Sequence, residues 1–343
     1  YNTLEYIKEE YILKKKIITI LIAIILIAVI IITSIKLTDK DEEKKNLTTI
    51  RLAEVTHSVF YAPLYVAIEN GYFEEEGIEI ELILTPGADK VSAAVLSDTV
   101  DVGFAGTESS IYVYTGGEED YLVTFAGLTK RDGQFILARD CSSEFELTDL
   151  YGSEILVGRA GGMPAVNFLN AMKNAGIDVS EINVNYSIDF ASLSGSFIGG
   201  IGDYVNLFEP TATTVVNVTD ACIVESIGSL SGEVPYTAFY ARKSYLENNE
   251  EILDGFTRAI AKGLEFVLES DSTTTAEVIL PQFPDSALND IITIIDNYKK
   301  YDSWLSTPYI TEESFTNLQD MLINNDLLGY YVPYSDLIHN LYE

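Results

Sequence analysis

Positions 101–110 read DVGFAGTESS, which predicts a short buried strand, a glycine turn and the start of a helix. Val102 and Phe104 are β-favouring apolar residues beside glycines, and Thr107 is a residue type that caps helix N-termini. A strand followed by a helix start places free backbone N–H groups at the carboxyl edge of a sheet, where open α/β folds bind ligands. Turns of this kind also occur without a ligand, so the rest of the chain decides whether this one is a site.

An apolar run lies close to the N-terminus. Residues 17–35 carry no charged side chain, and a helix of that length, at about 1.5 Å per residue, crosses a hydrocarbon core of roughly 30 Å. Lys14, Lys15 and Lys16 precede it, so the positive-inside rule predicts a cytoplasmic segment at 1–16 and an extracytoplasmic remainder, anchored in the cell membrane. A cleaved secretory signal is the alternative. Both interpretations place the folded part outside the cytoplasm.

The charge of the folded part limits its partners. Residues 36–48 are rich in Lys, Asp and Glu and predict a solvated tether. The chain holds 21 basic and 53 acidic residues; eight and seven of these lie in 1–45, which leaves 13 and 46 for 46–343, a net charge of −33. This excludes binding to nucleic acid or to anionic lipid. The only cysteines, Cys141 and Cys222, are candidates either for a disulfide or for two independent buried thiols.

From residue 49 onward, short apolar stretches alternate with helical patterns, which predicts βαβ units and a mostly parallel sheet. The pattern assigns 49–138 to a first lobe, whose sheet includes a strand at 134–138. A second series of strands and helices at 139–235 forms a second lobe, and the strand at 236–241 returns the chain to the first. The part from 245 to the end, within the lobe 1 segment 236–343, is mainly helical. Its helices are predicted at 250–268, 273–280, 286–298, 312–324 and 334–342.

Five motifs, taken in order, resemble a known family. They are YAPLYVA at 61–67, NGYF at 70–73, EGI at 76–78, DVGF at 101–104 and FEP at 208–210. In this combination the chain is similar, over residues 50–300, to ABC-transporter substrate-binding proteins of the nitrate/sulfonate/taurine and thiamine-pyrimidine precursor type. The resemblance implies an α/β, two-lobed periplasmic-binding-protein-like fold of type 2, with a ligand cleft between the lobes. Its implied partners are a small-molecule ligand and the ABC permease and ATPase subunits, for a monomer without cofactor, metal or catalytic residues.

The resemblance also implies the ligand-binding residues. They are Thr56, His57, Ser58 and Tyr61 in the first loop, Gly106, Thr107 and Glu108 in the turn after Phe104, Gly161, Gly162 and Met163 in the second lobe, and Glu209 at a strand end. Each has a simpler interpretation. Gly161 and Gly162 are ordinary turn residues, Glu209 with Pro210 caps and opens a helix, and His57 is better suited to shaping its loop than to binding.

The predicted site residues favour one ligand class. An anion such as nitrate or a sulfonate needs neutral or cationic donors, whereas a buried carboxylate beside it, from Glu108 or Glu209, costs several kcal/mol unless protonated. Aromatic residues are abundant, although each is also a core candidate: Tyr61, Phe104, Tyr112, Phe190 and Phe208. Stacking rings with carboxylate acceptors suit a flat, hydrogen-bond-donating ligand, so the expected ligand is a thiamine-precursor aminopyrimidine or a similar heteroaromatic.

Two other classes of function compete with this interpretation. Some relatives of this fold synthesise the thiamine pyrimidine with a Cys-rich motif, a Lys and a His. This chain has no Cys cluster, and its two histidines are His57 and His339, so the sequence predicts no enzyme. A ligand-sensing ectodomain is compatible with a single anchor, but only about sixteen residues precede the apolar run. The third alternative is an anion-binding importer component of the sulfonate, taurine or nitrate type.

Overall fold

The computed structural model describes residues 47–342. The predicted cytoplasmic segment, the apolar run at 17–35 and all but the last residues of the tether lie outside the described residues. Within 47–342, no helix combines the length and the apolar character that a membrane span requires. Residues from Thr49 onward form one compact unit, and it contains two separate sheets.

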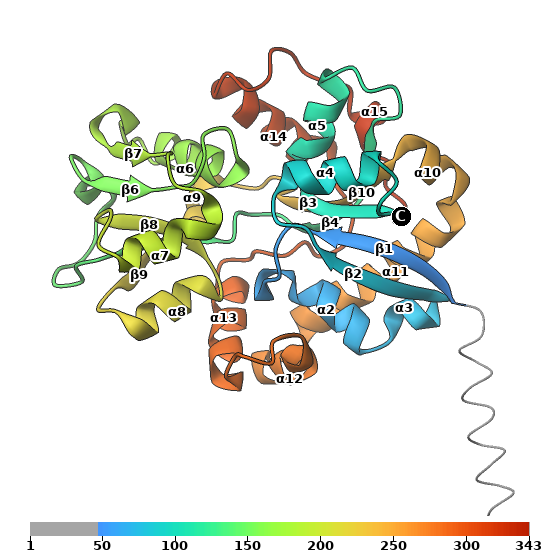
Figure 1. The fold of residues 1–343 in the computed structure, drawn as a ribbon, viewed down its shortest axis with the longest axis horizontal. Helices are drawn as coiled ribbons and strands as arrows, with labels where there is room; N and C mark the ends of the chain where they lie inside the picture. Colours follow the sequence, from blue (N-terminus) through green and yellow to red (C-terminus); the bar gives the residue numbers. More distant parts are fainter. Residues whose placement is uncertain (1–46, 343) are drawn as a thin grey trace, which may run out of the picture. The chain divides into compact units, whose positions relative to one another are not determined.

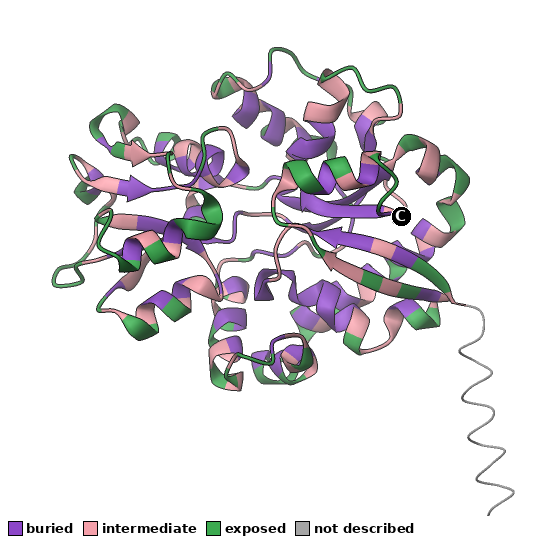
Figure 2. Cartoon of the chain, viewed as in Figure 1, coloured by how far each residue is buried: buried purple, intermediate pink, exposed green. Residues whose placement is uncertain are grey.

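The first sheet has the strand order β2-β1-β3-β10-β4 (Figure 1). Its strands are β1 (Thr48–Glu54), β2 (Ile78–Leu84), β3 (Val102–Gly106), β4 (Leu122–Thr129) and β10 (Thr237–Arg242). β1 pairs with β3 in parallel, whereas β10 runs antiparallel to both β3 and β4. β3 is buried along its whole length, and β2 at the sheet edge is partly exposed (Figure 2). The late strand β10 thus lies beside the early strand β3.

Helices surround this sheet. They are α2 (Ala62–Glu69), α3 (Tyr72–Glu75), α4 (Ala88–Leu96), α5 (Glu108–Thr115), α10 (Lys243–Asn248) and α11 (Glu250–Glu269), with the 3-10 turn η2 (Val59–Tyr61). α2 begins with Pro63 in its first turn and is followed by Gly71, whose φ of 72° only glycine adopts without strain. α11 packs on α2 so closely that a Cβ on Gly263 would lie 2.1 Å from the Pro63 carbonyl oxygen.

The second sheet has the order β7-β6-β8-β5-β9. Its strands are β5 (Gln134–Ala138), β6 (Glu154–Leu156), β7 (Asn183–Asn185), β8 (Tyr204–Phe208) and β9 (Cys222–Ser226). Its helices are α6 (Met163–Asn174), α7 (Leu193–Ile198), α8 (Thr211–Val218) and α9 (Ile227–Ser231), with 3-10 turns η3 (Leu147–Leu150), η4 (Val179–Glu181) and η5 (Phe190–Ser192).

The strand predicted at 134–138 in the first sheet belongs to the second. β5 pairs antiparallel with β8 and with β9, so the chain changes sheets at residues 130–133, before the strand rather than after it. Gly133 allows this passage, because a Cβ there would lie 2.6 Å from the Phe60 ring. The apolar sequence of this strand is compatible with either sheet, and only the strands with which it pairs show to which sheet it belongs.

Cys141 and Cys222 form a disulfide, with Cα atoms 6.1 Å apart. This decides between the two alternatives that the sequence left open. The bond joins the segment after β5 to the first residue of β9, which is also the neighbour of β5 in the sheet. The disulfide therefore links the edge strand β9 of the second sheet to the segment that follows β5.

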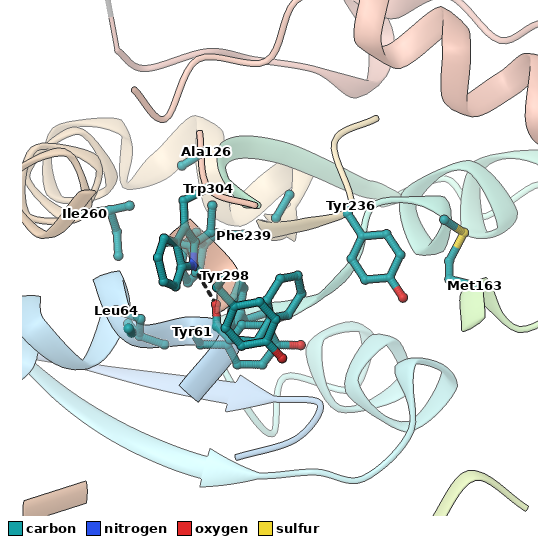
Figure 3. Close-up of a cluster of buried hydrophobic side chains, with 14 of the residues drawn as sticks. Tyr61, Leu64, Ala126, Met163, Tyr236, Phe239, Ile260, Tyr298 and Trp304 are labelled. Carbon is teal, nitrogen blue, oxygen red and sulfur yellow. Dashed lines mark hydrogen bonds between the residues drawn. The ribbon is translucent and has the colours of Figure 1, made fainter. Parts of the chain in front are cut away.

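The C-terminal helices reach both lobes. They are α12 (Ser272–Ile279), α13 (Leu288–Lys300), α14 (Glu312–Asn324) and α15 (Tyr334–Leu337), with the turn η6 (Leu280–Gln282). On α13, the Tyr298 hydroxyl accepts from the Glu209 backbone N–H at 3.1 Å and lies 3.3 Å from the Gly133 carbonyl oxygen. The Trp304 indole N–H donates to the Phe60 carbonyl at 2.8 Å (Figure 3). α14 packs on α6 of the second lobe, whereas the sequence predicted that the C-terminal helices pack around the first lobe.

Candidate functional site

The turn between β3 and α5 places a buried acid at the start of a helix. Glu108 is the first residue of α5 and is 5% exposed. A Cβ on Gly106 would lie 2.0 Å from Glu108 Oε2, so the carboxyl folds back over the turn and requires glycine there. Burial raises the pKa of Glu108 to about 8, opposed by its own backbone N–H and by Arg159. A carboxyl with this pKa is mostly protonated at neutral pH.

Three polar atoms of this turn have no hydrogen-bond partner in the part of the chain that the structure describes. They are Thr107 Oγ1, Glu108 Oε2 and the Tyr112 hydroxyl. Thr107 occupies the N-cap position as predicted, but its side chain makes no cap bond; the Ser110 N–H bonds to the Thr107 backbone carbonyl instead, at 3.2 Å. Because buried polar groups are normally satisfied, three that lack a partner within residues 47–342, on this turn and on the helix that follows it, make it a candidate place for an external partner.

A second set of buried polar groups lies where the chain enters the second sheet. Asp132 is 2% exposed and accepts hydrogen bonds from Gln134 N at 2.7 Å and from Gln134 Nε2 at 2.9 Å. Burial raises its pKa to about 7. Gln134 Nε2 also lies 3.2 Å from the Pro164 carbonyl oxygen at the start of α6, while Gln134 Oε1 has no partner among residues 47–342.

Asn206 extends this second set. The β5–β8 register pairs Gln134 with Phe208 and Ile136 with Asn206, so Gln134 and Asn206 are on the same face of the sheet. Asn206 is fully buried, and neither its Oδ1 nor its Nδ2 has a partner in the described chain. Asn167 Oδ1 and Ser231 Oγ are also buried without a hydrogen-bond partner in the described chain. The second lobe therefore also offers unused donors and acceptors.

Two tyrosines connect the two sets. Burial, Glu54, Glu108 and Asp132 raise the pKa of Tyr61, and burial, Asp132, Tyr61 and Glu108 raise that of Tyr236. Each phenol thus lies within electrostatic reach of both acids. Tyr61 and Tyr236 belong to the same buried group as Met163, the first residue of α6 (Figure 3).

The β6–α6 turn approaches the first lobe. Gly161 (φ of 77°) and Gly162, the N-cap, both half-buried, lead into Met163, which is 4% exposed. In the same turn, the Arg159 guanidinium lies 3.8 Å from an Asp89 carboxylate oxygen on α4, and both side chains are 64% exposed. Arg159 also lowers the pKa of Glu108 and of Tyr112. The segment that leads into the predicted turn of the second lobe therefore contacts α4 of the first lobe.

His57 is engaged within the first lobe. Its Nδ1 lies 2.7 Å from Glu54 Oε1 and its Nε2 lies 2.9 Å from the Gln282 carbonyl oxygen. The Tyr65 hydroxyl donates to the other Glu54 oxygen at 2.8 Å. The hydrogen bond to Glu54 raises the pKa of His57, against desolvation. Both ring nitrogens thus hold the loop after β1, in which Thr56 is half-buried.

Glu209 caps a helix. Its Oε2 accepts from Thr213 N at 2.8 Å and its Oε1 accepts from Thr213 Oγ1 at 3.0 Å, at the start of α8. Ser58 Oγ donates to the Glu209 backbone carbonyl at 2.5 Å, which joins the two lobes. Burial raises the pKa of Glu209, but its two oxygens, unlike Glu108 Oε2, already have partners. The simpler interpretation of the Glu209-Pro210 motif accounts for these contacts.

The predicted aromatic residues divide between core and surface. Phe104 stacks on Phe239 with ring centroids 4.3 Å apart, and Tyr61 meets the Phe104 edge at 4.4 Å. Phe208 is half-buried and Phe190 is 40% exposed, with ring centroids 5.6 Å apart. Phe104 is therefore a core residue, whereas Phe190 and Phe208 lie nearer the surface.

Sequence reasoning missed Asp132, Gln134 and Asn206. A signal was present, because Gln134 opens the apolar strand QFILA and Asn206 stands in the middle of YVNLF. A polar side chain inside a strand that is otherwise apolar is either paired in the core or placed for a ligand. Only the structure shows that Asn206 is unpaired within residues 47–342.

Comparison with known protein families identifies the family of this chain. The model of the family described as "NMT1/THI5 like" matches residues 59–273, which is more than half of the chain. The chain belongs to the NMT1/THI5-like family. This confirms the family resemblance that the sequence motifs predicted. The chain is 38% identical over 299 residues to a Bacillus subtilis (strain 168) protein named "Putative binding protein YtlA", covering 87% of this chain and 90% of the relative.

More distant relatives of the chain have two kinds of name. A formylaminopyrimidine-binding protein of Halalkalibacterium halodurans is 24% identical over 263 residues, which is 75% of this chain and 73% of the relative. A 4-amino-5-hydroxymethyl-2-methylpyrimidine phosphate synthase of Aspergillus parasiticus is 24% identical over 230 residues, covering 64% of this chain and 66% of the relative. One binds a pyrimidine by name, and the other synthesises one.

Solved structures show the fold. The periplasmic aliphatic sulphonate binding protein SsuA of Escherichia coli superposes with a TM-score of 0.65 and 16% identity, over 84% of this chain and 96% of that one. The two-sheet periplasmic-binding-protein-like architecture expected from the sequence is therefore confirmed. At this identity, the similarity concerns the fold and leaves the ligand open.

Proposed function

We propose that the chain is the extracytoplasmic substrate-binding protein of an ABC importer, and that it captures a small uncharged or weakly basic heteroaromatic solute. The observation that carries this proposal is the set of buried polar atoms that find no partner in the described chain. Thr107, Glu108 and Tyr112 contribute them from the first lobe, and Gln134 and Asn206 from the second. An unsatisfied buried group costs about 1–3 kcal/mol, so a ligand that satisfies several of them is bound strongly.

The ligand would join the lobes. Ser58 and Glu209 already link them at one place and Arg159 and Asp89 at another. In this proposal the ligand bridges the polar set of the first lobe and that of the second. Closure around a small molecule is one of the standard domain motions of proteins. In this proposal the closed, loaded form delivers its ligand to a permease, whose ATPase subunits drive import, and the binding protein acts as a monomer.

The extracytoplasmic location has independent support. The Cys141–Cys222 disulfide is a bond that forms and persists in oxidising compartments. The predicted anchor at 17–35 also places the folded part outside the cytoplasm, because basic residues precede it. In this proposal the anchor holds the binding protein at the outer face of the cell membrane, beside its permease.

An aminopyrimidine is the ligand class that the acids favour. Glu108 occupies the start of α5, the position at which an anion-binding protein would place the charge of its ligand. The formylaminopyrimidine-binding relative gives the same class by name. A sulfonate or nitrate would lie beside this carboxyl. Arg159, which lowers the pKa of Glu108, is the cation that could offset its charge, and the Arg159 side chain is largely exposed.

A screen of ligands tests the proposal. Thermal unfolding of the full chain in mild detergent is measured with 4-amino-5-hydroxymethyl-2-methylpyrimidine, its formylaminomethyl analogue, taurine and nitrate. A ligand at 100 times its Kd stabilises the folded state by about 2.7 kcal/mol. We expect stabilisation by the pyrimidines only. Stabilisation by taurine or nitrate alone would establish the anion-binding alternative, and conversion of any pyrimidine precursor to product would establish an enzyme.

A further inference from the structure

We infer that Glu108 is the proton donor of the binding site, and that the ligand is an uncharged N-heterocycle whose ring nitrogen takes the Glu108 proton on binding. The O–H bond of the carboxyl breaks and an N–H bond forms on the ring, so at pH 7 an ion pair arises inside the site without net proton exchange with water. This inference rests on the proposed function and specifies the ligand edge: a basic ring nitrogen with an amino group beside it.

The geometry of the turn supports this role. Glu108 Oε2 is buried and has no partner in the described chain, and it lies against Gly106, where no side chain can intervene. Thr107 Oγ1 and the Tyr112 hydroxyl are also free, and each can donate or accept. The turn thus offers an acid beside two adaptable hydroxyls, which matches a ring nitrogen flanked by an amino group.

The charges around Glu108 explain why the acid is neutral before the ligand arrives. Five groups interact electrostatically with its charge, one on α5 itself and four on other segments: Tyr112, and Arg159, Tyr61, Tyr236 and Tyr240. The four phenols carry no positive charge, and Arg159 is largely exposed and lies near Asp89 on α4. Desolvation therefore dominates and raises the pKa of Glu108 to about 8.

A neutral base fits the site with its neutral acid better than a ligand that arrives already charged. A ligand with a permanent positive charge would have to expel the Glu108 proton into water, whereas an anion would be repelled if the proton left. When the proton moves from Glu108 to the ligand, the hydrogen bond becomes charge-assisted, which is roughly twice as strong as a neutral one. The low polarity of the surroundings strengthens it further.

The test counts protons. Calorimetric titration of the full chain in mild detergent, in two buffers of different ionisation enthalpy, measures the protons exchanged when 4-amino-5-hydroxymethyl-2-methylpyrimidine binds. At pH 7 the expected exchange is close to zero, because the proton is already on Glu108. At pH 9 the empty protein has lost that proton, so the complex must take up nearly one, and the affinity falls about tenfold per pH unit above the pKa.

Two variants locate the effect. Glu108→Gln keeps the size of the side chain but has no proton to give, so binding should weaken at least tenfold and lose its dependence on pH between 7 and 9. Glu118→Gln, an exposed position beyond α5, should behave as the wild type. Thermal unfolding without ligand verifies that both variants are folded, and the wild-type proton count stands without them.

The outcomes are distinct. Release of a proton at pH 7, or no uptake at pH 9, would overturn the inference while leaving the pyrimidine-binding function in place. Uptake at pH 9 that persists in Glu108→Gln would also overturn it, because another group would then be the donor. Failure of the wild type to bind the pyrimidine would overturn the ligand class itself, and this inference with it.

Discussion

Replacing Asn206 by Leu should stabilise the empty protein and weaken its ligand binding. Asn206 is fully buried in the middle of β8, and both amide atoms lack a partner within residues 47–342. Leaving buried polar groups unsatisfied costs about 1–3 kcal/mol. Leu has nearly the same shape and removes that cost, so the free energy of unfolding should rise by about 1–3 kcal/mol. This corresponds to about 2–6 °C in Tm.

A matched substitution gives the opposite sign. Asn340 is an asparagine whose amide is fully used: its Oδ1 accepts from Ile310 N at 2.8 Å, and its Nδ2 donates to the Ile310 carbonyl at 3.0 Å. Asn340→Leu leaves the Ile310 N–H without its acceptor, while the Ile310 carbonyl keeps the Tyr334 hydroxyl, and should lower the free energy of unfolding by about 1–3 kcal/mol. The two variants make the same chemical change in opposite contexts.

Urea unfolding followed by circular dichroism measures both stabilities, and calorimetric titration with the aminopyrimidine measures binding. We expect Asn206→Leu to be more stable than the wild type and to bind at least tenfold more weakly. A loss of stability in Asn206→Leu would refute the reasoning, because it would mean that the amide serves the fold. Stabilisation with unchanged binding would place Asn206 outside the site.

Four further expectations concern single features of the fold. Gly106→Ala puts a methyl group where the neighbouring carboxyl lies, so pyrimidine affinity in calorimetry should fall at least tenfold; unchanged affinity would mean that this acid does not touch the ligand. Gly263→Ala meets a backbone carbonyl of α2 that cannot move aside, and urea unfolding should show a loss of about 1–3 kcal/mol. The raised pKa of His57 stabilises the fold below about pH 6.5, and this contribution should disappear as pH rises through the folded-state pKa; His57→Gln should flatten the stability profile above pH 6. Reducing the Cys141–Cys222 bond should cost about 2–5 kcal/mol, and an unchanged Tm under reductant would contradict this.

The sequence predicts elements better than it predicts their neighbours. The helices expected at 250–268 and 312–324 are α11 (Glu250–Glu269) and α14 (Glu312–Asn324). Such helices carry their own periodicity, caps and breaks, which are local properties of the chain. The strand at 134–138 was also found, but in the wrong sheet, because strand pairing depends on contacts with residues distant in sequence.

The same limit applies to the site. Glu108 and Glu209 look equivalent in the sequence, since each follows a buried strand and opens a helix. In the structure, the two oxygens of Glu209 accept from Thr213, whereas Glu108 Oε2 has no partner within residues 47–342. Asn206 was missed because a polar residue inside an apolar strand is as compatible with a paired core amide as with a ligand contact. The proposed function rests on hydrogen bonds that the described chain leaves unmade, which no local pattern encodes.

In the proposed function, Glu108 sets the ligand charge that this site accepts. The first turn of α5 offers backbone N–H groups and the positive end of a helix dipole, which attract an anion. The Glu108 carboxyl folds onto this turn and interacts with its own backbone N–H, so it occupies the place that an anionic ligand would take. In its neutral form it donates a proton, which suits a ligand that is a base. If Glu108→Ala gave a protein that binds a small sulfonate where the wild type does not, the acid would be identified as the group that sets the charge preference.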